Sequence, residues 1–171
     1  EATQDFYVVG VGASAGGLDA LDRFFTAAPA NGGLAYVVIQ HLSPDYKSLM
    51  AGLLGKRTDM PVHVAEDGMA IEPDHVYLIP PKKNITIFHK KLYLTTRESG
   101  LLHLPIDIFF HSLAEDLEEK AIGVILSGTG SDGTRGIRAI KEKGGLIIVQ
   151  DEQSATFDGM PRSAISTNLV D

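Results

Sequence analysis

The 171-residue chain contains no cysteine, which excludes disulfide bonds, thiolate catalysis and cysteine-ligated zinc. No apolar run reaches the length of about 18 residues that a membrane-spanning helix needs. Positive charge is also scarce, because 15 Lys and Arg residues against 22 Asp and Glu residues leave a net charge of −7. This balance argues against nucleic acid or an anionic membrane surface as the main partner.

Internal repeats, low-complexity tracts and composition boundaries are absent as well, so residues 1–171 are expected to form one domain. Hydrophobic residues make up 44% of the chain, which is enough for one sizeable core. A cysteine-free chain without a secretory signal suits the cytoplasm. Because the chain starts with Glu1 rather than Met, we expect it to be excised from a longer protein.

Short β-branched apolar runs alternate with segments that place Leu, Ile or Phe at helical spacing. The runs predict strands at 6–11, 35–40, 62–65, 76–79, 121–127 and 146–151. The spaced segments predict helices at 16–29, 47–57, 105–117 and 134–143. The stretch ITIFHKKLYLTT, residues 85–96, predicts an antiparallel hairpin. Together these elements indicate an α/β, doubly wound, mostly parallel sheet with helices on both faces and the hairpin at one edge.

Functional side chains of such sheets gather just past the carboxyl ends of the strands. Ser14 follows the first predicted strand, His41 follows the second, and Asp132 lies in the glycine-rich loop after the strand at 121–127. A serine, a histidine and an aspartate at three strand ends can serve as nucleophile, general base and orienting carboxylate.

The first turn also matches a dinucleotide-binding pattern, Gly10-x-Gly12-x-x-Ala15. That interpretation needs an acidic residue at the end of the second strand, and residues 35–42 contain no Asp or Glu. No Gly-Lys-Ser/Thr follows the turn, so a P-loop is not expected. Nicotinamide or flavin binding by an oxidoreductase is therefore a minor alternative. The remaining histidines show no metal-ligand spacing, and we expect neither a cofactor nor a metal ion.

Each of the three candidate residues also has a purely structural interpretation. Ser14 can serve as the N-cap of a helix. His41 can be a hydrogen-bonded histidine of the core, and Asp132 can stabilise a turn or cap a helix. Against this, the segment Gly12-Ala13-Ser14-Ala15-Gly16 completes a Gly-x-Ser-x-Gly pattern. In that pattern a sharp strand-to-helix turn exposes the serine Oγ, so the combination favours catalysis.

Five segments together resemble the catalytic domain of chemotaxis-type protein-glutamate methylesterases, the CheB family. They are, in order, VGVGASAGGLDAL, VVIQHLSPDY, VYLIPPKKN, LSGTGSDGTRGIRAIKEKGG and VQDEQSATFDGMPRSAI. The resemblance implies that Ser14 is the nucleophile, His41 the base and Asp132 the orienting acid. It also implies an oxyanion hole formed by the backbone N–H groups of Ala15 and Thr129. The implied reactions are hydrolysis of glutamyl methyl esters on chemoreceptor helices, with release of methanol, and deamidation of receptor glutamines.

Two positions depart from the common family pattern: Thr129 stands where many members have methionine, and Ala15 where many have threonine. The chain does not include the receiver domain of stand-alone members. The segments GASAGGLDAL and SGTGSDGTRG resemble those of members fused to methyltransferase and sensor modules. The resemblance therefore implies a target that is either a chemoreceptor or a related signalling protein. The chain stops at NLVD, before the family's usual end, and we expect a terminal helix to be missing.

A substrate helix that carries an ester is bulky, so we expect Ser14 to lie in an open cleft rather than a deep apolar pocket. The alternative from another class is a catalytically weak regulatory domain that binds a partner helix within a fused signalling protein.

Overall fold

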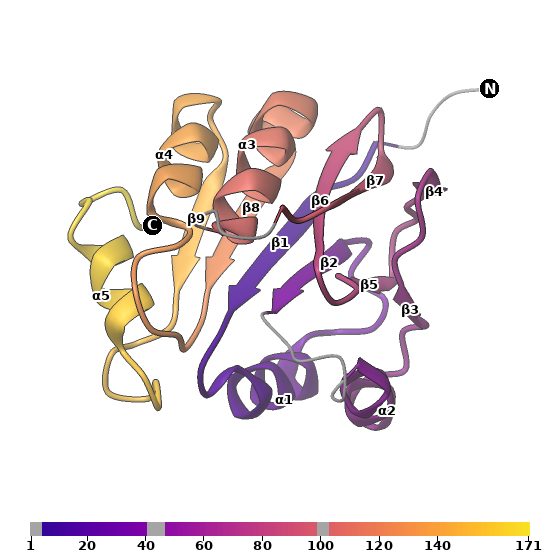
Figure 1. Ribbon diagram of the computed structural model, residues 1–171, viewed down its shortest axis with the longest axis horizontal. Helices are drawn as coiled ribbons and strands as arrows, with labels where there is room; N and C mark the ends of the chain where they lie inside the picture. Colours follow the sequence, from indigo (N-terminus) through magenta and orange to yellow (C-terminus); the bar gives the residue numbers. More distant parts are fainter. Residues whose placement is uncertain (1–4, 41–46, 99–102) are drawn as a thin grey trace.

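Six parallel strands form the central sheet of the computed structural model, which describes residues 5–40, 47–98 and 103–171 (Figure 1). The strand order is β3-β5-β2-β1-β8-β9, and all neighbours run parallel. The order reverses direction at β1, as the prediction of a doubly wound sheet requires. The strands are β1 (Val8–Ala13), β2 (Ala35–Gln40), β3 (Val62–Val64), β5 (Val76–Leu78), β8 (Ala121–Ile125) and β9 (Leu146–Val149).

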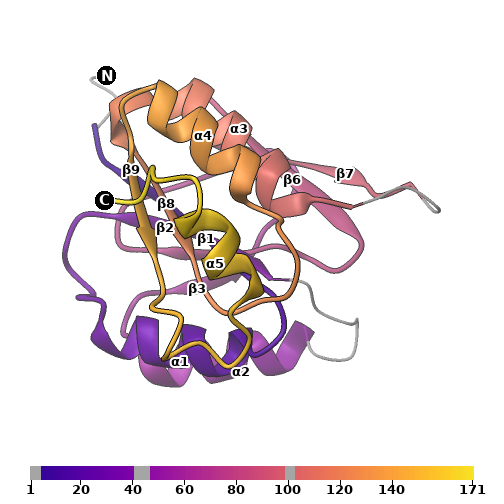
Figure 2. The same ribbon diagram turned by 90° about the vertical axis from the view of Figure 1, so that its left-hand side faces the viewer.

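Helices cover both faces of this sheet (Figure 2). They are α1 (Gly17–Ala27), α2 (Lys47–Arg57), α3 (Pro105–Leu117), α4 (Thr134–Glu142) and α5 (Gly159–Ile165), with a 3₁₀ turn at Glu118–Lys120. Helices α1 and α2 lie on one face, and α3 and α4 lie on the other. Because strand side chains alternate between faces, Val8 packs in the core under α3 and α4, whereas Val9 packs in the core under α1 and α2.

The predicted hairpin is present, and it belongs to a second, antiparallel sheet. This sheet has the order β4-β7-β6 and consists of β4 (Met69–Ala70), β6 (Lys83–Phe88) and β7 (Lys91–Thr96). It does not extend an edge of the main sheet, because α3 supplies its anchors. Ser112 Oγ accepts the N–H of Ile87 at 3.0 Å, and the Asp116 carboxylate accepts the N–H groups of His89 and Lys90 at 2.7 and 3.0 Å.

Glycines within β1 let α3 lie close against the sheet. A Cβ atom on Gly10 would lie 2.8 Å from a ring carbon of Phe110, and one on Gly12 would lie 2.7 Å from Ile106. The two glycines therefore make room for helix packing inside the strand. This accounts for the first two positions of the dinucleotide-like pattern without a bound pyrophosphate.

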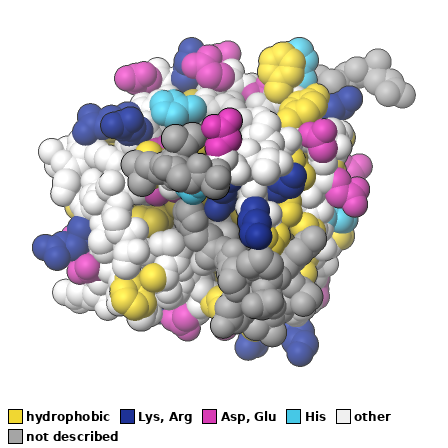
Figure 3. All heavy atoms as spheres, viewed as in Figure 1, with side chains coloured by type: hydrophobic (Ala, Val, Ile, Leu, Met, Phe, Trp, Pro, Cys, Tyr) yellow, Lys and Arg dark blue, Asp and Glu magenta, His cyan; other side chains and the backbone are white. Residues whose placement is uncertain are grey.

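Two observations bear on the kinds of surface that the described residues present. No helix in the three described ranges has the length and apolar character to cross a membrane. On the face viewed in Figure 3, basic and acidic side chains are interspersed. This face therefore offers no large basic surface for nucleic acid, and the net charge of the chain is −7.

Candidate active site

Ser14 lies in the tight turn between β1 and α1, at the carboxyl edge of the main sheet. The N-cap of α1 is Gly16, which has φ 74° and makes no side-chain cap hydrogen bond. The structural role considered for Ser14, that of an N-cap, is thus not the one it has. The turn is fixed by its backbone instead: Ser14 N–H donates to Ser127 O at 3.0 Å, and Gly17 N–H donates to Ser14 O at 2.8 Å.

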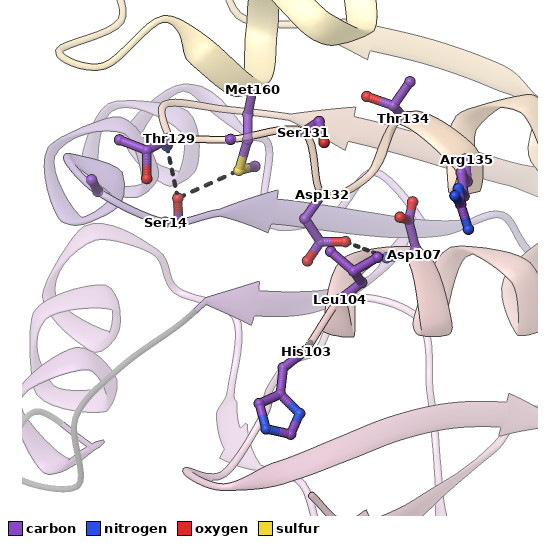
Figure 4. Close-up of a pocket in the computed structure, with 12 residues that line it drawn as sticks. Ser14, His103, Leu104, Asp107, Thr129, Ser131, Asp132, Thr134, Arg135 and Met160 are labelled. Carbon is purple, nitrogen blue, oxygen red and sulfur yellow. Dashed lines mark hydrogen bonds between the residues drawn. The ribbon is translucent and has the colours of Figure 1, made fainter. Parts of the chain in front are cut away.

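The Ser14 hydroxyl contacts a backbone N–H and a thioether (Figure 4). Thr129 N–H donates to Ser14 Oγ at 3.1 Å, and Ser14 Oγ lies 3.4 Å from the Met160 Sδ atom, to which it donates. The donor predicted from Thr129 for the oxyanion hole therefore points at the predicted nucleophile. Because this donor is a backbone group, threonine supplies it as well as methionine would.

A cleft with a volume of about 710 Å³ opens in front of Ser14. Ser14, Thr129 and Met160 lie together on one side of it, and His103 and Arg135 line it at two separate places away from Ser14. Ser14 is partly exposed there, in agreement with the expectation of an open cleft rather than a deep apolar pocket. A cleft of this size is typical of small-molecule and side-chain binding sites.

Asp132 lines the same cleft and is 8% exposed. One oxygen of its carboxylate accepts the N–H of Ile106 at 3.0 Å, and the other accepts the N–H of Asp107 at 2.9 Å. The predicted alternative of a helix cap is therefore correct in part: Asp132 caps α3, the helix beside its own loop. Burial lowers the pKa of the nearby Arg97 guanidinium, and the negative charge of Asp132 opposes that shift.

His41, the predicted base, lies outside the described residues. The residue before it in the sequence is Gln40, which ends β2 and is paired in register with Ala13 of β1. Gln40 is 6% exposed, and its Nε2 donates to Ser14 O at 2.9 Å. The end of β2 and the Ser14 turn are thus held together by a buried side chain.

Two other serines near the glycine-rich loop have different surroundings. Ser127 is fully buried, and its Oγ donates to Ala15 O at 2.8 Å and accepts the N–H of Phe157 at 3.0 Å. Ser127 therefore joins three backbone segments beneath the site. Ser131 is exposed at the cleft, and its hydroxyl makes no hydrogen bond to a described residue. Among these serines, Ser14 alone combines access with a donor aimed at its oxygen.

Sequence reasoning missed Met160 and the short helix α5 that carries it. Met160 is 1% exposed, and its N–H donates to Gly128 O at 2.9 Å, which places its sulfur beside Ser14. The available signal was the segment DGMPRSAI, in which Pro161 lies in the first turn of a helix, where proline is tolerated. Within the described ranges, no group of three or more His, Asp or Glu residues is arranged to hold a metal ion.

Comparison with known proteins places this site in a family. The model of the CheB methylesterase family matches residues 9–171. The chain belongs to the CheB methylesterase family. Its structure is similar to the crystal structure of the Thermotoga maritima CheB methylesterase catalytic domain, with a TM-score of 0.88 and 31% sequence identity over 98% of this chain and 92% of that one.

Two relatives of this chain are longer than the segment they share with it. The protein-glutamate methylesterase/protein-glutamine glutaminase 1 of Bordetella avium is 36% identical over 168 residues, which cover 97% of this chain and 49% of the relative. An uncharacterized 104.1 kDa protein in the hypE 3′ region of Rhodobacter capsulatus is 49% identical over 122 residues, which cover 71% of this chain and 13% of that protein. The chain thus spans about half of the first relative and a small part of the second.

Proposed function

We propose that the protein is a serine hydrolase that removes methyl groups from glutamyl methyl esters, and deamidates glutamines, on a chemoreceptor or a related signalling protein. The observation that carries the proposal is the partly exposed Ser14 hydroxyl in a cleft, with Thr129 N–H directed at it from 3.1 Å. The substrate class rests on the chain's family and on the names of its methylesterase/glutaminase relatives.

The proposed reaction is acyl transfer through Ser14. His41 accepts the proton of the Ser14 hydroxyl as Oγ attacks the ester carbonyl, and Asp132 holds the imidazole tautomer and stabilises the imidazolium. Methanol leaves after receiving the proton from His41. Water, activated by His41, then attacks the acyl-enzyme and releases the glutamate side chain and Ser14. Glutamine follows the same route with ammonia as the leaving group.

Negative charge on the carbonyl oxygen develops beside two backbone donors, Thr129 N–H and Ala15 N–H. A single such donor contributes roughly 3–4 kcal/mol to stabilisation of the transition state. The position of Thr129 N–H supports this role, because a donor that reaches Ser14 Oγ also lies near the oxygen of the carbonyl that Oγ attacks. The N–H of the residue after the nucleophile is the usual second donor at such a turn.

The direct test is methanol release from a methylated receptor fragment by the purified protein. Release that depends on the protein would support the proposal. A folded protein that binds the methylated fragment without releasing methanol would contradict it and favour the regulatory alternative.

We expect kcat/KM for methanol release to rise with pH through a midpoint near 6.5, the approximate reference pKa of histidine. The reason is that only neutral His41 can accept the serine proton. The measurement is a pH profile from about 5 to 8 with chemistry shown to limit the rate. His103 also lines the cleft, so His103→Gln is the control and should keep the midpoint. A flat profile would rule out His41 as the base.

Replacing Gly128 with alanine should reduce kcat by about 10²-fold, the effect of a small displacement of reacting groups. A Cβ atom on Gly128 would overlap both Ser14 Oγ and Met160 Sδ, so the nucleophile must shift. The matched control is Gly52→Ala in α2, where a Cβ atom meets nothing within 4 Å. That variant should keep full activity and gain roughly 1 kcal/mol in helix stability. Wild-type kcat in folded Gly128→Ala would contradict the expectation.

A further inference from the structure

Two aspartates beside the cleft each cap the start of a neighbouring helix: Asp132 caps α3, and Asp107 caps α4. Neither helix has a side-chain cap at its own N-cap residue, which is Leu104 for α3 and Gly133 for α4. Backbone N–H groups in the first turn of α3, which have no acceptor within the helix, instead donate to the carboxylate of Asp132, which precedes α4 in the sequence. In return, Asp107 from the first turn of α3 meets the free N–H groups of α4. Figure 4 shows both carboxylates at this junction.

Asp107 is buried at this junction, with 5% of its surface exposed. Its Oδ1 accepts the N–H of Gly133 at 3.0 Å and the N–H of Gly136 at 2.7 Å. Its own N–H donates to Asp132 at 2.9 Å. Burial raises the pKa of Asp107, as does the negative charge of Asp132, whereas the two glycine N–H groups and His111 lower it.

Glycine at two positions lets the Asp107 carboxylate reach the backbone of α4. Gly133 has φ 99°, a conformation that strains other residues. A Cβ atom on Gly136 would crowd Phe110 at 2.5 Å and Asp107 Oδ1 at 3.2 Å. The buried Asp107 carboxylate is therefore bonded to the end of the Asp132 loop. A shift of this loop would break the hydrogen bonds from Gly133 and Gly136 to Asp107.

Two carboxylates in one buried junction repel each other, so the arrangement needs a compensating gain. Four backbone N–H groups and the positive ends of two helices supply part of it. A helix cap alone does not require this pairing, because a serine or asparagine at each N-cap position satisfies the same donors. The pairing does something that separate caps cannot: it links the position of the Asp132 loop to α3.

We propose that Asp107 is a positioning residue for Asp132, because it fixes the position of the loop that carries Asp132 relative to the cleft. The inference rests on the proposed function, in which Asp132 orients His41. Asp107 also lines the cleft, but this role does not require it to touch the substrate. It acts through the N–H groups of Gly133, the residue after Asp132, and of Gly136 in the first turn of α4.

The test compares Asp107→Ala with Asp107→Asn. In Asp107→Ala, kcat should fall by about 10²-fold, as for a misplaced catalytic group, with KM little changed. The acid-side midpoint of the kcat/KM profile should also move to lower pH, because a displaced Asp132 stabilises the imidazolium less. In Asp107→Asn the amide oxygen still accepts both glycine N–H groups, so most of the wild-type kcat and the original midpoint should return.

The matched control is Asp116→Ala on the same helix. Asp116 also accepts two backbone N–H groups, at 2.7 and 3.0 Å, and these belong to the hairpin. Its loss should lower stability without moving the pH midpoint. A purely structural role for Asp107 predicts the same behaviour in Asp107→Ala: a smaller active fraction with an unchanged midpoint, which would overturn the proposal.

Amide hydrogen exchange separates failure of this inference from failure of the proposed function. If Asp107 holds the loop, Asp107→Ala should speed exchange at Ile106, which is bonded to Asp132, as well as at Gly133 and Gly136. Unchanged protection of Ile106 would overturn the inference whether or not the wild-type protein releases methanol. If Asp107→Ala does not fold, the same measurements are made on Asp107→Asn. The inference would be overturned if Asp107→Asn showed normal amide exchange at Ile106 and yet lost as much kcat as Asp132→Asn.

Discussion

Replacing Ser14 with alanine should reduce the initial rate of methanol release by roughly 10⁴-fold or more, as for other triad nucleophiles. The reason is that an alanine offers no oxygen for the acyl-enzyme, while the oxyanion donors remain and give only residual catalysis. The fold should be unaffected, since the Ser14 side chain caps no helix and its turn is held by backbone bonds. Circular dichroism and thermal unfolding check that point beside the rate.

Two serine variants serve as controls for this loss. Ser131→Ala should keep most of the activity, because Ser131 is exposed and has no proton-transfer role. Ser127→Ala should behave differently: it removes the buried acceptor of Phe157 N–H, and an unsatisfied buried group costs about 1–3 kcal/mol of stability. Full activity in folded Ser14→Ala would remove Ser14 as the nucleophile, and a large loss in folded, stable Ser131→Ala would point to Ser131.

The main sheet was predictable because its central strands are short, apolar and buried along most of their length. Five of the six residues in β2 are apolar, so their burial follows from composition, whereas the burial of Gln40 depends on its hydrogen bond to Ser14 O. The helix at Pro105–Leu117 was equally clear, with proline in its first turn. The strand ends then brought Ser14 and Asp132 to one cleft, as the topology of a parallel sheet requires.

Contacts between distant segments were not predictable. Met160 reaches Ser14 across 146 positions of sequence, and α5, with seven residues, is too short to show a clear periodicity. The capping role of Asp132 was missed in part, because sequence rules pair a cap with the helix that follows it. Here the cap serves the helix beside it in space. The location of the hairpin likewise depends on Ser112 and Asp116 of α3, which no local pattern shows.

Asp132→Asn should lower the rate of methanol release by about 10⁴-fold, because an amide in place of the carboxylate favours the wrong histidine tautomer. The structure adds a second effect. Each carboxylate oxygen of Asp132 accepts one N–H group, from Ile106 or Asp107, so the amide must turn its NH₂ toward one of these donors. The resulting unsatisfied donor should cost about 1–3 kcal/mol of stability, measured by denaturant unfolding.

A double variant separates these two effects. Triad residues act as a unit. The double variant Ser14→Ala/Asp132→Asn should therefore release methanol about as slowly as the single variant Ser14→Ala. The double variant Ser14→Ala/His41→Ala should do the same. The stability loss of Asp132→Asn should persist in its double variant, because Ser14 is no part of the α3 cap. Rates that fall multiplicatively in the doubles would mean that Ser14, His41 and Asp132 do not form one catalytic unit. A stability loss without the rate loss in Asp132→Asn would leave Asp132 as a helix cap alone.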